Sequence, residues 1–215
     1  MKYVSTYVVF SLIVALAGGP AAAAAPRTGD QRASIARSPF MRIFGPSLPP
    51  YGYVMFCENN PRECRRRRGV LKRVQLTPAR LLELDNINRR VNETIEPMTD
   101  RDHYGVAEYW TLPVNRGDCE DYALLKQHML EKRGWPQSGL LMTVVRDENG
   151  DGHAVLTVRT AQGDYILDNK TSEILTWSQT PYQYVMRQSY LNPQNWMRLD
   201  RLSGAGVVRR SGSGR

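Results

Sequence analysis

The sequence predicts an α+β fold in which two helices precede an antiparallel sheet. Apolar residues recur at helical spacing in two segments, 77–97 and 118–133. Three shorter segments follow and have the alternating pattern and flanking turns of strands, at 140–146, 153–159 and 164–168. Helices grouped before strands, rather than alternating with them, favour an antiparallel meander over a parallel sheet.

The first 25 residues have the features of a secretory signal peptide. Lys2 precedes an apolar run from Tyr3 to about Leu16, and small residues with several A-x-A cleavage sites follow at Ala17–Ala25. The apolar run is shorter than the ~20 residues that a membrane span needs. We therefore expect cleavage near Ala23–Ala25, no stable membrane span afterwards, and a periplasmic or secreted protein.

Composition divides the rest of the chain into three parts. Residues 26–70 are rich in Pro, Gly, Ser and Arg, which predicts a flexible leader followed by a loop. Residues 71–202 carry the periodic segments and predict one domain, which is expected to hold the chemistry. The glycine- and serine-rich residues 203–215 predict a disordered tail.

The cysteines are unevenly placed along the chain. Cys57 and Cys64 lie close together in a polar, proline-containing loop, and an oxidising compartment favours their pairing as a disulfide. A metal-binding pair is the alternative, although no second pair is present to complete a tetrahedral site. Cys119 is then left as the odd thiol.

The charge of the chain is basic, with 29 Lys and Arg against 21 Asp and Glu and a net charge of +8. The excess is concentrated in Arg65–Arg68 and in the tail, whereas the centre of the chain is mixed in sign. We interpret this charge as solvated surface and expect no nucleic-acid partner. Arg65–Arg68 either docks a partner or only solubilises the loop.

The first predicted helix has clear signals at both ends. Thr77 is a typical N-cap residue, Pro78 suits the first helical position, and Pro97 ends the helix. Its buried face is predicted to consist of Leu84, Ile87, Val91 and Ile95.

The second predicted helix follows a polar loop at 98–117. Asp118 is expected to cap it, and it runs to about Arg133 and stops at Gly134. Its buried stripe is predicted to consist of Leu124, Leu125, Met129 and Leu130.

The segment Asp147–Gly152 matches the opening of an EF-hand calcium loop, D-x-N-x-D-G. Such a loop needs a bidentate Glu at its twelfth position, where this chain has Val158, and a helix after it. The segment instead lies between two predicted strands and is predicted to be a hairpin turn.

Cys119 is the candidate nucleophile because it falls in the first turn of the second helix. Backbone N–H groups there lower the pKa of a thiol and can hold a developing oxyanion. His153 begins a strand one hairpin downstream, and Asp168 ends the next strand, which brings it beside His153. This order suits a nucleophile, a base and a carboxylate that orients the base.

Other interpretations of these residues remain open. A cysteine at a helix start is often inert packing. His128 lies mid-helix and projects away from Cys119, whereas His103 lies in a loop and is not excluded by spacing. Asp164 or Asn169 are alternatives to Asp168 as the orienting group.

Four sequence blocks resemble those of the bacterial transglutaminase-like cysteine proteinases. The blocks are Arg116-Gly117-Asp118-Cys119-Glu120-Asp121-Tyr122-Ala123, Val144-Val145-Arg146-Asp147, Gly152-His153-Ala154-Val155-Leu156 and Tyr165-Ile166-Leu167-Asp168-Asn169. The resemblance extends from roughly Cys57 to Leu199 and includes Tyr109-Trp110 and Pro181-Tyr182. It implies a papain-like, transglutaminase-like core with the nucleophile at the N-terminus of a helix that packs on an antiparallel sheet.

The resemblance also implies a function, a metal and partners. It assigns the catalytic roles to Cys119, His153 and Asp168. The best-understood members are periplasmic, calcium-dependent proteases that release large adhesins from the cell surface, which implies a protein substrate of that kind. An inner-membrane receptor is implied as a regulator.

A calcium site is expected at Asp118, Glu120 and Asp121, which match the family's acidic positions. Carboxylates in a first helical turn are favourable to the helix dipole even without a metal. Three acids around a thiol should nevertheless raise its pKa, and a bound Ca²⁺ would cancel that field.

Two further functions fit the same residues. An amidase or acyltransferase would use the same three residues, and product analysis with an added amine would distinguish it from a protease. A non-catalytic binding module would keep its activity in a Cys119→Ser variant.

Overall fold

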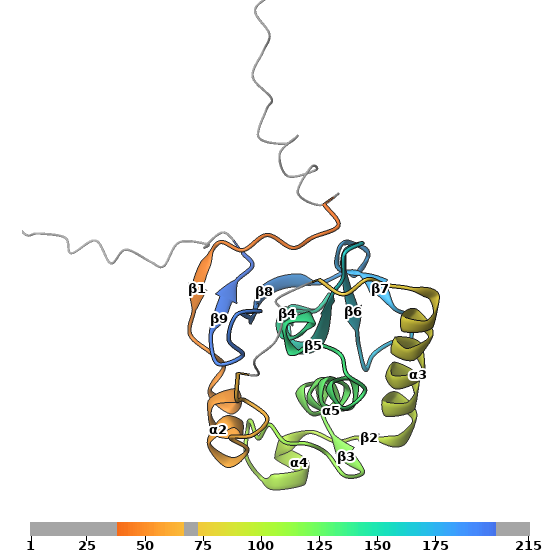
Figure 1. The fold of residues 1–215 in the computed structure, drawn as a ribbon. Coiled ribbons are helices and arrows are strands. Elements are labelled where there is room, and N and C mark those ends of the chain that lie inside the picture. Colours follow the sequence, from red (N-terminus) through yellow and green to blue (C-terminus); the bar gives the residue numbers. More distant parts are fainter. Residues whose placement is uncertain (1–37, 67–72, 201–215) are drawn as a thin grey trace, which may run out of the picture.

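The computed structural model describes residues 38–66 and 73–200, and these form a mixed helix and sheet fold (Figure 1). Seven strands form one antiparallel sheet in the order β1-β9-β8-β4-β5-β6-β7. Its centre is the meander β4 (Leu140–Arg146), β5 (Gly152–Arg159) and β6 (Asp164–Leu167). Helix α5 (Cys119–Lys132) packs on β4 and β5, and α3 (Pro78–Thr94) packs on α5. The predicted α+β class is confirmed.

The two long helices begin where their capping residues predict. The Thr77 side chain accepts a hydrogen bond from the Arg80 N–H at 3.3 Å, at the start of α3. Helix α5 begins at Cys119 and is followed by Gly134, whose φ of +81° suits a residue without a side chain. Asp118 occupies the N-cap position, but its carboxylate makes no capping bond and accepts the Asp100 N–H instead.

The central hairpin has the predicted strands and turn. Strands β4 and β5 pair from Leu140 with Val158 to Arg146 with Gly152. The Asp147 N–H donates to the Asp151 carbonyl at 3.0 Å, which closes the turn. Because β5 also pairs with β6, the start of β5 and the residue after β6 lie near one another.

The sheet is larger than the sequence predicts. Four short strands extend the meander, namely β7 (Leu175–Thr176), β8 (Gln183–Gln188), β9 (Trp196–Arg198) and β1 (Gly45–Ser47). Short 3₁₀ helices lie at Gln137–Gly139 and Trp177–Gln179. Strand β1 pairs with β9 and β9 pairs with β8, so residues near both ends of the described chain form one edge of the sheet.

The prediction of a flexible leader and loop was wrong for Gly45–Asn59. After β1, helix α2 (Tyr51–Asn59) buries Tyr53 and Phe56 in the core. A three-residue edge strand offers too few alternating positions to be recognised, and prolines around it suggest a loop. A side chain at Gly52 would collide with the Trp110 indole, so this glycine allows α2 to pack closely on Trp110.

A disulfide joins Cys57 in α2 to Cys64, with a Cα–Cα distance of 5.4 Å. The predicted pairing is confirmed. Cys64 is buried and belongs to the main hydrophobic core. The bond therefore fastens the segment after α2 to that core.

The predicted polar loop at 98–117 is partly regular. Helix α4 (Asp100–Tyr104) begins after Thr99, whose side chain accepts the Asp102 N–H. Strands β2 (Glu96–Pro97) and β3 (Arg116–Gly117) pair in parallel, which returns the chain to the end of α3. This return brings Asp100 next to Asp118.

Several predictions lie outside the described residues. These are the signal peptide at 1–25, the tail at 203–215, and Arg67 and Arg68 of the basic run. Within 38–66 and 73–200, none of the helices combines the length and the apolar character needed to cross a membrane.

Candidate active site

A cleft of about 200 Å³ opens beside the N-terminus of α5. Its walls come from five parts of the chain: Pro50 before α2, Trp110, the start of α5, the start of β5, and Val144 and Met186 of the sheet. Cys119 lies in this cleft and keeps partial exposure to solvent. Trp110 lines the cleft, whereas Tyr109 is exposed and donates its N–H to Asp100.

The thiol of Cys119 has two hydrogen-bond partners among the described residues. It donates to Glu120 Oε2 at 3.1 Å and accepts the Ala154 N–H at 3.4 Å. Burial raises the pKa of the Cys119 thiol well above its usual value, and the charge of Glu120 adds to this. The helix amides alone would lower that pKa. Without a metal, burial and the neighbouring acids raise the pKa of the thiol by more than the helix amides lower it.

His153 and Asp168 form a buried pair beside the thiol. His153 Nε2 lies 2.9 Å from Asp168 Oδ1, and both side chains are at most 4% exposed. Burial raises the pKa of the Asp168 carboxyl, whereas the hydrogen bond and charge of His153 lower it. The lowering effects together are larger, so the pKa lies below its usual value. Because Ala154 follows His153 and contacts the thiol, the imidazole and the thiol line the same cleft.

Further contacts hold the Asp168 carboxylate in place. The Tyr182 hydroxyl donates to Oδ2, and the Lys170 N–H donates to Oδ1 at 3.0 Å. The Tyr182 ring also meets the His153 ring edge-on, with centroids 5.5 Å apart. Tyr182 was noticed in the sequence only as part of the Pro181-Tyr182 block, and no periodicity marks it as a partner of the acid.

The structure separates His153 from its rivals. His103 stacks on Tyr104 with ring centroids 4.0 Å apart, and His128 pairs with Glu63 at 3.0 Å. Neither lines the cleft.

The alternatives to Asp168 are also placed elsewhere. Asp164 is bound by Arg73 and Arg187. The Oδ1 of Asn169 is buried without a hydrogen-bond partner in the described part of the chain. Asp168 is the residue that pairs with His153.

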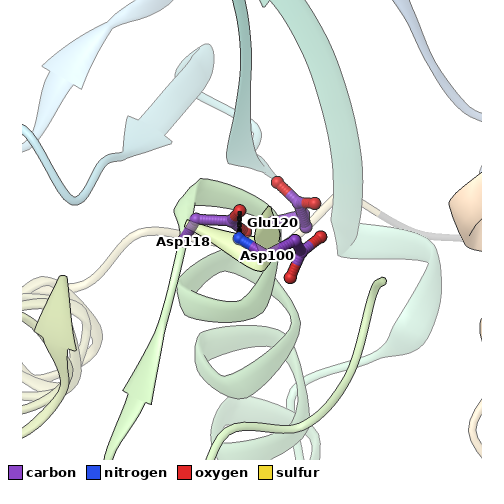
Figure 2. A group of neighbouring side chains, drawn as sticks. All are labelled: Asp100, Asp118 and Glu120. Carbon is purple, nitrogen blue, oxygen red and sulfur yellow. Dashed lines mark hydrogen bonds between the residues drawn. The ribbon is translucent and has the colours of Figure 1, made fainter. Parts of the chain in front are cut away.

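Three neighbouring carboxylates form a cluster (Figure 2), and one of them, Glu120, accepts the hydrogen bond of the Cys119 thiol. Ligand atoms of Asp100, Asp118 and Glu120 all lie within 4.8 Å of one another. The Asp100 N–H donates to Asp118 Oδ2 at 3.2 Å, while Asp118 Oδ1 is buried with no partner in the described residues. The cluster thus brings several carboxylate oxygens together and includes one buried acceptor that the described residues leave unsatisfied.

The electrostatics of this cluster favour a bound cation. Burial raises the pKa of Glu120 to about 9, with a contribution from the Asp118 charge. Burial likewise raises the pKa of Asp121 to about 8 and that of Asp100 to about 6. Neighbouring buried carboxylates resist ionising together. Converging carboxylate oxygens fit a hard cation such as Ca²⁺, which would remove that penalty.

The carboxylates that converge differ from the predicted set of Asp118, Glu120 and Asp121. Asp100 joins Asp118 and Glu120, and Asp121 lies outside this group. Asp121 Oδ1 accepts the Thr111 N–H at 2.8 Å, and its Oδ2 is buried without a partner in the described chain. Asp100 lies in the polar loop before α5, where no periodic pattern suggests that it meets Asp118.

The fold and cleft define a transglutaminase-like protein with a thiol at a helix N-terminus. Residues 43–203 match the model of the family described as bacterial transglutaminase-like cysteine proteinase BTLCP. The match covers most of the chain, and the protein therefore belongs to this family of cysteine peptidases. Its substrates are accordingly proteins.

Solved structures of Legionella pneumophila LapG are similar to this chain. The calcium-bound form is 25% identical, with a TM-score of 0.49, and the match covers 63% of this chain and 77% of that one. The EGTA-treated form is 28% identical, with a TM-score of 0.44, and the match covers 53% of this chain and 64% of that one. A third LapG structure is 27% identical, with a TM-score of 0.44, over 53% and 66% of the two chains. No curated protein matches the chain.

Proposed function

We propose that the protein is a periplasmic, calcium-dependent endopeptidase in which Cys119, His153 and Asp168 carry out the reaction. The observation that supports this most directly is the cleft itself, which combines a partly exposed thiol with a buried His153–Asp168 pair. The family supplies the reaction class, which is hydrolysis of a peptide bond.

Each of the three residues has a distinct role in this proposal. The Cys119 thiolate attacks the scissile carbonyl, and His153 takes the thiol proton and returns it to the leaving amine. Asp168 holds the imidazole in the tautomer that the transfer needs. The N–H of Cys119, in the first turn of α5, is a suitable donor to the oxyanion.

Calcium would be held by Asp100, Asp118 and Glu120. It would supply positive charge where the charge of Asp118 now raises the pKa of Asp100 and Glu120, and where the charges of Glu120 and Asp118 raise the pKa of the thiol. Glu120 also accepts the thiol hydrogen bond. A Glu120 carboxylate engaged by a cation is a weaker acceptor, so the thiol proton is freer to move to His153.

The proposed substrate is a large cell-surface protein such as an adhesin. The predicted export signal and the family resemblance support a surface-exposed target. The apolar side chains of Trp110, Val144 and Met186 line the cleft, and they suit a peptide with small or apolar residues beside the scissile bond. An inner-membrane receptor as regulator belongs to this proposal and rests on the resemblance alone.

Alkylation of Cys119 tests the site without knowledge of the substrate. Cys57 and Cys64 are joined, so iodoacetamide should label Cys119 alone. Labelling at pH 7 should be fast with Ca²⁺, slow with EGTA, and slow in His153→Ala even with Ca²⁺. Equal rates in all three samples would contradict both the base and the metal.

Cleavage of a surface protein tests the activity. The calcium-loaded protein should cut surface proteins exposed on cells of its own source, and Cys119→Ser should not. Cutting that persists in Cys119→Ser would show that another group is the nucleophile.

A further inference from the structure

A lysine is buried in the middle of α5, the helix that begins with the candidate nucleophile. Lys126 is 0% exposed, and its Nζ has no hydrogen-bond partner among the described residues. It lies about two turns after Cys119, on the helix face that also carries Tyr122. An amine taken out of water without a partner is costly, so packing alone gives no reason for a lysine here.

The charge that acts on this amine is the carboxylate of Asp168. Burial lowers the pKa of Lys126 to about 7, and the Asp168 charge opposes that decrease. The Tyr122 ring lies 5.8 Å from Nζ on the same helix. In the elements packed on α5, the buried titratable side chains are His153 and Arg159 of β5.

Lys126 is not needed to place the backbone or oxygens of Asp168. The carboxylate is already held by His153, Tyr182 and the Lys170 N–H. Its carbonyl accepts the Asn92 side-chain amide from α3 at 2.9 Å. Lys126 does not line the cleft either, which excludes direct contact with a substrate bound there.

We propose that Lys126 is a positioning residue of the reaction that acts through Asp168, and this inference rests on the roles proposed above for His153 and Asp168. Its positive charge weakens the hold of the Asp168 carboxylate on an imidazole proton. Below about pH 7, where Lys126 carries its charge, the imidazole therefore gives up its proton more easily and is ready to accept the thiol proton. Without the lysine, the His153–Asp168 pair would retain a proton to higher pH.

The variant Lys126→Met tests this directly, because methionine is apolar and of similar length. The acidic limb of the kcat/KM profile of the calcium-loaded protein should move to higher pH by about 0.5–1 unit. The melting temperature should stay equal or rise, since an unpaired buried amine is removed. Lys126→Arg, which keeps the charge, should restore the profile. The matched control is Lys132→Met, which removes an exposed lysine from the last turn of α5 and should leave the profile unchanged.

A second measurement does not depend on catalysis. The titration midpoint of the His153 imidazole, followed by NMR, should rise in Lys126→Met, and this rise should vanish when Asp168→Asn is already present. If Lys126→Met does not fold, Lys126→Gln serves the same purpose. An unchanged midpoint and profile, with stability and activity falling together, would reduce Lys126 to a packing residue.

The two proposals fail in different ways. An unreactive Cys119 together with a lysine-dependent His153 midpoint would refute the protease mechanism and leave the coupling intact. An active protease whose His153 midpoint ignores Lys126 would refute the coupling and leave the mechanism intact.

Discussion

Two sites in the protein hold acidic side chains away from solvent, and their negative charges are balanced differently. Asp164, which is 0% exposed, accepts the Arg73 and Arg187 guanidinium groups at 2.9 and 3.0 Å and the Met41 N–H at 2.9 Å. Asp100, Asp118 and Glu120 lie within 4.8 Å of one another, and the hydrogen bonds that reach them come from backbone amides and the Cys119 thiol.

The difference separates a structural acid from a binding acid. The negative charge of Asp164 is neutralised by Arg73 and Arg187. This carboxylate therefore stabilises the fold and needs no ligand. The second group has no such counterion in the described residues and therefore suits a cation from solution. The source of the opposite charge distinguishes the two sites.

The largest expected effect is the loss of stability when Asp164, the acid paired with arginines, is removed. Asp164→Ala leaves Arg187 buried with its ion-pair partner removed and releases the Met41 amide. Unfolding in urea should show a loss of about 3–5 kcal/mol, with unchanged Ca²⁺ affinity for the protein that remains folded. Asp151→Ala, in an exposed turn, is the control and should change stability little. A small loss of stability in Asp164→Ala would mean that Arg73 and Arg187 find other hydrogen-bond partners.

The unbalanced group, which consists of Asp100, Asp118 and Glu120, should make the calcium-free protein less stable as pH rises. The folded-state pKa values of Glu120 and Asp100 are raised to about 9 and about 6, so the folded state binds more protons than the unfolded state above about pH 4. With EGTA, the free energy of unfolding should fall by about 2–3 kcal/mol between pH 5 and 8, because local relaxation limits the repulsion. Saturating Ca²⁺ should abolish this slope. A stability in EGTA that rises with pH would refute the uncompensated cluster.

Gly117→Ala probes the close approach beside the unbalanced group. A Cβ at Gly117 would lie 2.5 Å from Asp121 Oδ2, so β3 or the start of α5 would have to shift. Thermal unfolding should show a loss of about 1–3 kcal/mol. Gly152→Ala, where the added carbon would meet nothing within 4 Å, should not show it. Equal stability of the two variants would mean that the start of α5 adapts freely.

The smallest expected effect is on metal affinity alone. Asp100→Asn should weaken Ca²⁺ binding about 10-fold, equivalent to ~1.4 kcal/mol, without lowering the stability of the calcium-free protein. Calorimetry, or terbium luminescence excited through Trp110, would measure the change. Asp102→Asn, an exposed acid of the same helix, should bind normally. Wild-type affinity in Asp100→Asn would remove Asp100 from the ligands.

The parts of the fold that the sequence predicts are those with local signals. Thr77 and Pro78 mark the start of α3, and Gly134 marks the end of α5. The alternation and turn residues predict the central hairpin, and the resulting order of strands places Asp168 beside His153.

The parts that were missed depend on contacts between distant segments. Strand β1 is three residues long and is recognisable only through its pairing with β9. Asp100 meets Asp118 because β2 and β3 return the chain, which no local pattern encodes. Lys126 has the composition of a solvent-facing helical residue, and only the packing of α5 shows that it is buried.

The pairing of β1 with β9 has a mechanical consequence. Gly45 lies opposite Arg198 and Ser47 opposite Trp196, so tension applied to the chain on both sides of the fold would peel this pair apart one rung at a time. Such a geometry resists force weakly, since the rungs break in succession rather than together. Only Leu48 and Pro49 separate β1 from Pro50 in the cleft wall. A pull on a tethered molecule would therefore loosen the cleft before it disturbed the central strands.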